Sequence, residues 1–286
     1  MSYFIAEVSS NHSKDIKRAL EFIDVAASVG CNSVKFQLFK IDQLFAPEIL
    51  QKSEKHRERK EWELPLDFLP ILSDRCHDKG IEFGCTPFYL DAVLELEPYV
   101  DFYKIASYEL LWDDLLIACA RTLKPVIIST GMANLDEIKH AVEVLRANNC
   151  EPTVLHCTSA YPTPYEQANL SAIEIIRDAT GCNTGWSDHT VDPGVIHRAI
   201  HKWGANTIEF HLDLEGKGEE FGSGHCWLPE QIGALIKEVR HAVDADGDGV
   251  KEPVPSEISD RLWRTDPFDG LRPFQSIRRS FNPDEK

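Results

Sequence analysis

Eight short runs rich in β-branched and aromatic residues alternate along this chain with segments that have the periodicity of amphipathic helices. The runs are 3–8, 33–38, 81–85, 101–106, 125–129, 153–157, 183–187 and 207–212. Helical patterns between them include 14–29, 68–79 and 194–203. Eight β-then-α units in succession predict an α/β fold of the TIM (β/α)8 barrel type, and a doubly wound open sheet is the weaker alternative.

The length of the chain agrees with one such barrel. It has 286 residues, and a (β/α)8 barrel usually needs about 250. No flexible linker interrupts the pattern, so we expect a catalytic barrel over 1–242 and an irregular extension, 243–286, that packs on the barrel exterior. A run of charged residues within 42–63 predicts a solvent-exposed helix face, and a lid over the barrel mouth is the alternative.

Composition narrows the classes of partner and compartment. Lys and Arg number 30 against 47 Asp and Glu, for a formal net charge of −17, which argues against binding to nucleic acid or to an anionic membrane surface. Eight cysteines are scattered without a CxxC pair, as expected for reduced, buried thiols of a cytoplasmic protein. The chain shows neither a basic leader nor a long apolar segment, so export and membrane insertion are not predicted.

Two histidines follow neighbouring strand patterns near the end of the barrel. His189 comes after the run 183–187, and His211 lies on the run 207–212, with one helical pattern between them. Adjacent parallel strands lie about 5 Å apart, so the two imidazoles can share one metal ion. Glu209 falls on the same strand face as His211, because strand side chains alternate. The alternative is a pair of core histidines bonded to backbone groups.

Polar residues gather at the other strand ends as well, and in a (β/α)8 barrel these ends build the active site. The residues at these ends are Glu7, Asn11, His12, Lys35, Gln37, Thr86, Phe88, Lys104, Ser107, Glu109, Ser129, Thr130, Ser159, Tyr161, Ser187, His189, Glu209 and His211. Two lysines among several hydroxyls suit a small anion such as a phosphate ester with a carboxylate. Ion pairs between the lysines and barrel carboxylates are the alternative, and a Schiff-base lysine is disfavoured by those carboxylates.

Seven segments together carry a family resemblance. They are IAEVSSNH (5–12), VKFQ (34–37), CTPF (85–88), YKIAS (103–107), STGM (129–132), HCTSAYPTP (156–164) and SDHT (187–190). Over residues 3 to about 215 they resemble the sialic acid synthase (N-acetylneuraminate synthase) family. The resemblance implies a barrel enzyme that condenses phosphoenolpyruvate with an aldose, commonly N-acetylmannosamine, and that uses Mn²⁺ or Mg²⁺.

The resemblance also implies roles for individual residues. The implied metal ligands are His189 and His211. The implied phosphoenolpyruvate site consists of Lys35, Thr86, Lys104, Ser107, Ser129, Ser159 and Ser187. The implied sugar-facing residues are Gln37, Glu109, Tyr161 and Glu209, and Phe88 is a further candidate for substrate binding. The candidate catalytic residues are Glu7, Lys35, Lys104 and Glu209, of which Glu7 or Glu209 would position the attacking water.

The sequence departs from the family in several places, including Phe210, where the family has a basic residue before the histidine of the eighth strand. Gly224 stands where the family has an aspartate expected to bind a sugar hydroxyl. Trp227 nearby is interpreted either as a stacking wall for a different sugar or as a residue packed on the barrel rim. The resemblance further implies a C-terminal antifreeze-like domain, which we expect to be absent from this chain or supplied by a separate polypeptide, and we expect the chain to form a homo-oligomer.

These departures leave two other functions open. One is a metal-dependent barrel aldolase or lyase that acts on a keto acid or sugar phosphate without phosphoenolpyruvate. The other is a non-catalytic partner of a fuller synthase. The metal pair, both lysines and the hydroxyls speak against the second, because buried charges without a function would be costly.

Overall fold

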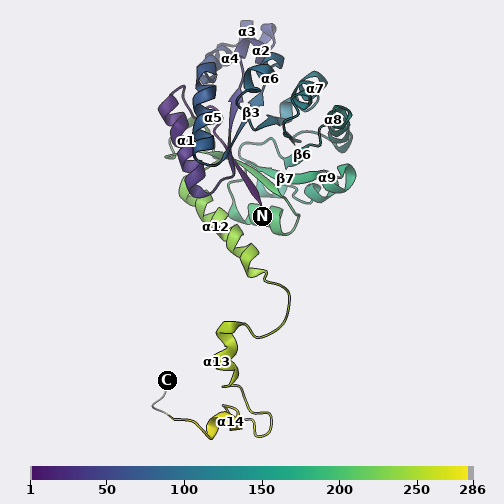
Figure 1. The fold of residues 1–286 in the computed structure, drawn as a ribbon. Coiled ribbons are helices and arrows are strands. Elements are labelled where there is room, and N and C mark those ends of the chain that lie inside the picture. Colours follow the sequence, from purple (N-terminus) through teal and green to yellow (C-terminus); the bar gives the residue numbers. More distant parts are fainter. Residues whose placement is uncertain (1, 283–286) are drawn as a thin grey trace. The chain divides into compact units, whose positions relative to one another are not determined.

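The computed structural model describes residues 2–282 and shows a closed parallel barrel (Figure 1). Its strands are β1 (Tyr3–Glu7), β2 (Ser33–Leu38), β3 (Glu82–Pro87), β4 (Phe102–Ile105), β5 (Val126–Ser129), β6 (Thr153–Cys157), β7 (Asn183–Asp188) and β8 (Thr207–Leu212). Each strand pairs in parallel with the next, and β1 also pairs with β8. The predicted TIM barrel is therefore confirmed, and the open sheet is excluded because β1 and β8 close the ring.

Helices surround the strands (Figure 1). They are α1 (Ile16–Val29), α5 (Leu69–Asp78), α6 (Leu90–Leu96), α7 (Asp113–Arg121), α8 (Leu135–Ala147), α9 (Ala172–Thr180), α10 (Pro193–His201) and α12 (Pro229–Ala245). Local sequence sets their ends: Asp15 accepts a hydrogen bond from the Lys17 amide and so starts α1, which ends at Gly30 with φ 95°. A side-chain acceptor at the N-cap and a left-handed glycine after the last turn are the usual helix boundaries.

The charge run between β2 and α5 forms short helices. They are α2 (Ile41–Leu44), α3 (Pro47–Lys52), α4 (Glu54–Glu58) and the 3-10 turn η1 (Arg59–Trp62). None of the residues in α3, α4 or η1 is buried, as predicted for a solvated helix face. Its role as a lid stays a prediction.

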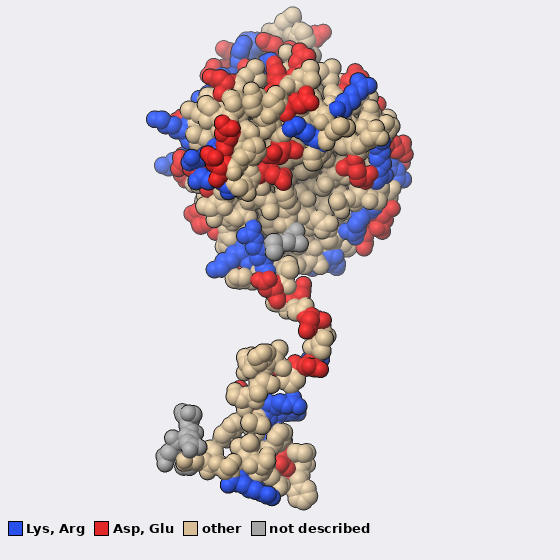
Figure 2. Space-filling view, viewed as in Figure 1, with Lys and Arg blue, Asp and Glu red and all other residues tan. Residues whose placement is uncertain are grey.

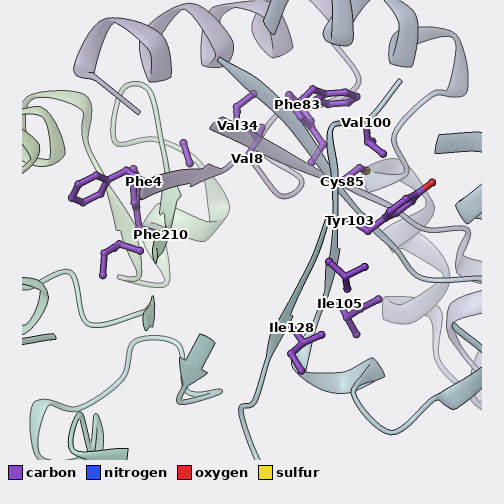
Figure 3. Packing of buried hydrophobic residues seen from close by; sticks show 14 of the residues in the cluster. Phe4, Val8, Val34, Phe83, Cys85, Val100, Tyr103, Ile105, Ile128 and Phe210 are labelled. Atoms are coloured by element: carbon purple, nitrogen blue, oxygen red, sulfur yellow. The ribbon is translucent and has the colours of Figure 1, made fainter. Parts of the chain in front are cut away.

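Side chains alternate between two cores. Phe4, Phe83 and Tyr103 belong to the core between strands and helices (Figure 3). On the other strand face, Ile5, Phe102, Ile127 and Leu155 form a separate apolar cluster inside the barrel. The next inward positions toward the carboxyl ends are polar or ionisable, namely Glu7, Lys104, Ser129 and Cys157. The apolar cluster is therefore the floor beneath the candidate site.

Two glycines let this interior close. A Cβ on Gly84 would lie 2.1 Å from the Phe102 ring, and one on Gly185 would lie 2.1 Å from the Thr207 carbonyl oxygen. Neither place has room for a methyl group. These glycines are therefore required by close packing inside the barrel.

A ninth strand, β9 (Cys226–Trp227), pairs with the carboxyl end of β8. Trp227 is 1% exposed, and its indole Nε1 donates a 2.9 Å hydrogen bond to Asp188 Oδ2. Trp186 Nε1 donates to Asp188 Oδ1, also at 2.9 Å. The interpretation of Trp227 as a stacking wall for the sugar is wrong, because its ring is buried and its N–H is used to tie β9 to β7.

The chain divides into two compact units, Met1–His241 and Ala242–Lys286. Within the described part of the second unit are η5 (Pro255–Glu257), α13 (Ile258–Arg261) and α14 (Gln275–Arg278). Asp266 organises its turn by accepting hydrogen bonds from the Phe268 and Gln275 amides, at 3.0 and 2.8 Å. The expected packing of this extension on the barrel stays a prediction.

The distribution of surface charges and the burial of the cysteines can be compared with what the composition predicts. Acidic and basic side chains are interspersed on the barrel face seen in Figure 2. All eight cysteines are buried, as predicted, and their reduced state stays a prediction. Among the described residues, no helix is both long and apolar enough to span a bilayer.

Candidate active site

The first buried ion pair joins β1 and β2. Glu7 and Lys35 are register partners on these strands, and the Glu7 carboxylate contacts the Lys35 ammonium. The same ammonium donates to Thr86 Oγ1 at 3.1 Å. Lys35 is 3% exposed, and burial lowers the pKa of its ammonium group to about 8. The predicted alternative, an ion pair with a barrel carboxylate, is thus what the structure shows for Lys35.

A second ion pair crosses the barrel from β4 to β8. Lys104 Nζ lies 3.7 Å from Glu209 Oε1 and donates to Ser129 Oγ at 2.6 Å. Ser187 Oγ also donates to Glu209 Oε1, at 3.0 Å. Burial raises the pKa of Glu209, but the nearby charges of Lys104 and Lys35 outweigh it and lower that pKa to about 2. The positive charges of two lysines and the negative charges of two glutamates therefore balance inside the barrel, with hydroxyl groups beside them.

Three loops bring small polar groups together next to this network. The Gly131 amide donates to Ser107 Oγ at 3.0 Å. A Cβ on Gly131 would lie 2.1 Å from Ser159 Oγ and 2.9 Å from Ser107 Oγ. Ser159 Oγ is buried and has no hydrogen-bond partner among the described residues. Hydroxyls that crowd a glycine backbone and leave one oxygen unpaired form a site suited to the oxygens of an anion.

The two predicted metal ligands lie close together at the ends of neighbouring strands, with their ring planes tilted by 60°. The His189 and His211 ring centroids are 5.4 Å apart. His189 Nδ1 lies 2.9 Å from the Thr158 carbonyl oxygen, and because a carbonyl only accepts, Nδ1 carries the proton and Nε2 keeps a free lone pair. Burial, followed by the nearby His211, lowers the pKa of His189 to about 3. His189 is thus a neutral imidazole oriented by a backbone group, as is usual for metal-binding histidines.

The predicted sugar-facing residues differ in their surroundings. Gln37 Nε2 donates to Glu7 Oε1 at 3.1 Å, which joins Gln37 to the first ion pair. Tyr161 is 44% exposed, and its ring contacts that of His189 with a centroid distance of 4.2 Å and a tilt of 39° between the ring planes. Phe88 packs edge-on against Phe39 at 6.0 Å, and its part in substrate binding stays a prediction.

Glu109 is the most unusual of these residues. It is 9% exposed, and its Oε2 lacks a hydrogen-bond partner in the described part of the chain. Burial raises the pKa of its carboxyl group to about 7, against small opposing effects of a backbone hydrogen bond and Lys104. Glu109 is therefore a carboxyl group that holds its proton into the neutral range and can donate a hydrogen bond.

Sequence reasoning missed two residues beside His211. Glu220 Oε2 lies 3.0 Å from His211 Nδ1 and 3.7 Å from His225 Nε2. Both residues come from the segment after β8, which contains α11 (Glu219–Gly222). His225 could have been noticed as a histidine beside the unusual Gly224, whereas no sequence pattern marked Glu220.

Comparison with known proteins identifies the family of this chain. Residues 22–251 match the sequence profile of the NeuB family. The chain belongs to the NeuB family. The resemblance to sialic acid synthases is confirmed by this match, and enzymes of the family are phosphoenolpyruvate-condensing synthases.

Individual relatives agree on the family and differ in their products. The N,N'-diacetyllegionaminic acid synthase of Campylobacter jejuni is 34% identical over 88% of this chain and 80% of its own. The pseudaminic acid synthase of Helicobacter pylori is 32% identical over 91% of this chain and 79% of its own. The crystal structure of N-acetylneuraminic acid synthetase from Leptospira borgpetersenii has a TM-score of 0.79 and 30% identity, over 91% of this chain and 90% of that one.

NeuB enzymes use a divalent metal, and the residues of this site fit one. His189 offers an unprotonated Nε2 beside His211. Donor atoms of His211, Glu220, His225 and Cys226 all lie within 4.8 Å of one another. Imidazole and carboxylate donors gathered at this spacing are typical of divalent transition-metal sites.

Proposed function

We propose that this NeuB enzyme condenses phosphoenolpyruvate with N-acetylmannosamine or a closely related aldose, giving a sialic-acid-like 2-keto sugar acid and inorganic phosphate. The observation that supports it best is the balanced network of two lysines and two glutamates, set between crowded hydroxyls and a pair of histidines. The lysines and hydroxyls suit a substrate that carries a phosphate and a carboxylate. The histidine pair suits the metal that would activate an aldehyde.

The lysines and hydroxyls would bind phosphoenolpyruvate. Lys104 with Ser129 on β5 and Lys35 with Thr86 on β3 each combine a cation with a hydroxyl at 2.6 and 3.1 Å. Their present carboxylate partners hold the ammonium groups in place until the substrate's oxygens arrive. Ser107 and Ser159 around Gly131 would bind the remaining anionic oxygens, with Ser187 oriented toward Glu209.

The proposed reaction forms one carbon–carbon bond and one bond from C2 of phosphoenolpyruvate to a water oxygen, and it breaks the C2–oxygen bond to phosphate. The methylene carbon of phosphoenolpyruvate attacks the aldehyde carbon of the sugar, whose oxygen takes up a proton. Water adds to the resulting cationic C2 carbon and loses a proton. Phosphate then leaves from that carbon, and a 2-keto acid remains.

Glu209 is the better placed of the two carboxylates to position this water. Its Oε1 accepts from Ser187, while its Oε2 is buried and lacks a described hydrogen-bond partner. Glu7 instead uses Oε1 for the Ser9 amide and Gln37, at 2.7 and 3.1 Å, and Oε2 for Lys35. A free carboxylate oxygen can accept a proton of water, so we assign Glu209 to this step and Glu7 to the orientation of Lys35.

The divalent ion, proposed to be Mn²⁺ or Mg²⁺, would be held by His189 and His211. When bound it polarises the aldehyde oxygen of the sugar and stabilises the negative charge that develops there. Thr158 fixes the ring of His189 for this purpose, and Tyr161 covers it. Glu109, Gln37 and Tyr161 remain the proposed contacts of the sugar hydroxyls.

The acceptor sugar would be selected by the segment after β8. Gly224 has φ 86°, and a Cβ there would lie 3.7 Å from the Pro162 ring, next to Tyr161. A side chain at this position would therefore project toward the loop after β6. The lack of one leaves room on the side where the family's aspartate is expected, which favours an acceptor with a different substituent.

The deciding experiment follows inorganic phosphate from the purified protein with Mn²⁺, phosphoenolpyruvate and a panel of aldoses headed by N-acetylmannosamine. We expect release that depends on an aldose, stops with a chelator, returns with Mn²⁺, and is lost in His189→Ala and His211→Ala. Phosphate release without phosphoenolpyruvate dependence would favour the aldolase alternative. Phosphoenolpyruvate binding without release for any sugar would refute the proposed acceptor class.

We also propose a cytoplasmic homo-oligomer that acts on small molecules, with no nucleic-acid or membrane partner. The free, buried cysteines and the acidic composition support this proposal. A separate polypeptide that completes the active site remains part of this proposal. Light scattering of the pure chain, with and without candidate partner proteins, tests the assembly.

A further inference from the structure

The segment after β8 folds back and places possible metal ligands next to His211, namely Glu220, His225 and Cys226. β9 pairs with β8 with Cys226 opposite His211, which places His225 directly before this register point. Glu220 comes from α11, and its Oε1 accepts from Ser10 Oγ at 3.1 Å. Its other oxygen points at the histidines, 3.0 Å from His211 Nδ1 and 3.7 Å from His225 Nε2.

His225 is the member of this group whose position most needs a reason. It is 5% exposed, and its Nδ1 is buried without a hydrogen-bond partner among residues 2–282. The distance from Nε2 to Glu220 is longer than a good hydrogen bond. A buried imidazole left with both nitrogens poorly satisfied is costly unless a further group binds it.

The surrounding rings keep this imidazole in place. The Tyr161 ring centroid lies 5.0 Å from that of His225, and the His211 ring lies 4.8 Å from it. Both contacts are edge-on, with interplanar angles of 77° and 75°. The nitrogens of His225 are thus held among groups that converge on one small volume.

We propose that Glu220 and His225 are further ligands of the divalent ion, in addition to His189 and His211, which deepens the proposed function because that function requires the ion. Ligand bonds of about 2.0–2.2 Å place the donors of one ion roughly 3–4.4 Å apart. The two Glu220 distances fall in this range. A carboxylate with imidazoles also suits Mn²⁺ better than imidazoles alone, because Mn²⁺ favours oxygen ligands.

This assignment gives the departure from the family a chemical meaning. The segment with Gly224 in place of an aspartate supplies a carboxylate from Glu220 instead, on the side of the metal rather than of the sugar. The Cys226 sulfur lies in the same group, but thiolates prefer softer ions, so we limit the proposal to the nitrogen and oxygen donors.

A simpler arrangement would give different results. Glu220 could accept a proton from His211 Nδ1 and only orient that ring, as carboxylates behind metal-bound histidines often do. In that arrangement His225 would not contact the ion. Replacement of Glu220 would weaken metal binding in both cases, whereas replacement of His225 would do so only if His225 is a ligand.

The test is a titration of the purified full chain with Mn²⁺ in the absence of phosphoenolpyruvate and sugar, with free Mn²⁺ followed by its electron paramagnetic resonance signal. We expect Glu220→Gln and His225→Gln each to weaken Mn²⁺ binding about tenfold or more. Glu215→Gln is the matched control, because Glu215 lies in the same segment but its side chain is 43% exposed and pairs with Arg18. It should bind Mn²⁺ as the unaltered chain does.

Circular dichroism establishes that each variant is folded, and His225→Asn serves if His225→Gln is not. Unchanged Mn²⁺ affinity in a folded His225 variant would overturn the proposal and leave Glu220 as a positioning residue. Because no substrate is present, the result is independent of turnover. Weakened Mn²⁺ binding with no phosphate release from any aldose would support these ligands while refuting the proposed acceptor.

Discussion

Replacing Glu109 with glutamine should make the protein more stable at alkaline pH, although it removes a candidate substrate-binding group. The carboxyl group is 9% exposed, and burial raises its pKa to about 7 from an ordinary value of 4.5. The folded protein therefore holds a proton that the unfolded chain loses between these two values. Stability falls as the pH rises through this window, because the unfolded state binds fewer protons than the native state.

The size of the effect follows from the shift. A displacement of about 2.5 pKa values corresponds to roughly 3 kcal/mol once Glu109 is ionised in both states, at 1.36 kcal/mol per unit. At pH 5 the same linkage costs less than about 1 kcal/mol, because the native carboxyl group keeps its proton at little expense. Glutamine cannot ionise, so Glu109→Gln should gain about 2 kcal/mol relative to the unaltered chain between pH 5 and pH 8.

Urea unfolding of both proteins at pH 5, 6, 7 and 8, with a chelator present to exclude metal effects, measures this difference. Glu143→Gln, at an exposed position of α8, controls for the loss of a carboxylate. The two stability curves should diverge above pH 5 for Glu109→Gln. Parallel curves across the whole range would refute the reasoning and would mean that Glu109 is ionised in the folded protein throughout.

Three further changes test other parts of the site. Gly131→Ala should weaken phosphoenolpyruvate binding about tenfold or more in calorimetry, because its Cβ would lie 2.1 Å from Ser159 Oγ; unaltered affinity would remove these hydroxyls from the substrate site. Asp188→Ala should lower the free energy of unfolding by about 3 kcal/mol or more, because two buried indole N–H groups lose their acceptor; a near-neutral result in denaturant unfolding would contradict that account. Gly224→Asp should shift the preference among aldoses measured by phosphate release, and an unchanged order would show that this segment does not select the sugar.

The barrel could be predicted because its signals are local and repeat. Each strand is a short apolar run bounded by turns, and the predicted runs 33–38, 153–157 and 207–212 coincide with observed strands. The other ends differ by a residue or two. The first helix, for example, begins at Ile16 rather than residue 14, because Asp15 uses its side chain as the cap. Such shifts depend on one hydrogen bond and not on periodicity.

Because strand ends build the active site of a (β/α)8 barrel, the sequence predicted which charged residues lie there. It did not predict which of them form ion pairs with each other. Glu7 meets Lys35 across one strand pair, where the register alone would have suggested it. Lys104 instead meets Glu209 across the barrel, and this contact depends on the barrel's cross-section and on side-chain rotamers. A pattern along the chain contains neither, so the partner of Lys104 could not be read from it.

The segment after β8 shows where sequence reasoning stopped. Trp227 lacked any periodic context, and its burial depends on Asp188, which lies 39 residues earlier in the chain. A buried carboxylate such as that of Asp188 requires hydrogen-bond donors. This requirement was the one indication in the sequence that a residue such as Trp227 would be buried beside it. Glu220 had no such signal, because a short irregular segment can fold back in many ways and only its three-dimensional path brings the carboxylate to His211.

The charge balance inside the barrel explains why these parts belong together. Two buried ammonium groups, of Lys35 and Lys104, lie beside two buried carboxylates, of Glu7 and Glu209, so their formal charges cancel. Phosphoenolpyruvate bound here, as we propose, would add negative charge to this site, where uncompensated charge is costly. A divalent cation at the neighbouring histidines, also proposed, would offset that charge, and a protonated Glu109 would not add to it. The apolar floor of Ile5, Phe102, Ile127 and Leu155 then strengthens every one of these interactions, because it keeps the local dielectric low.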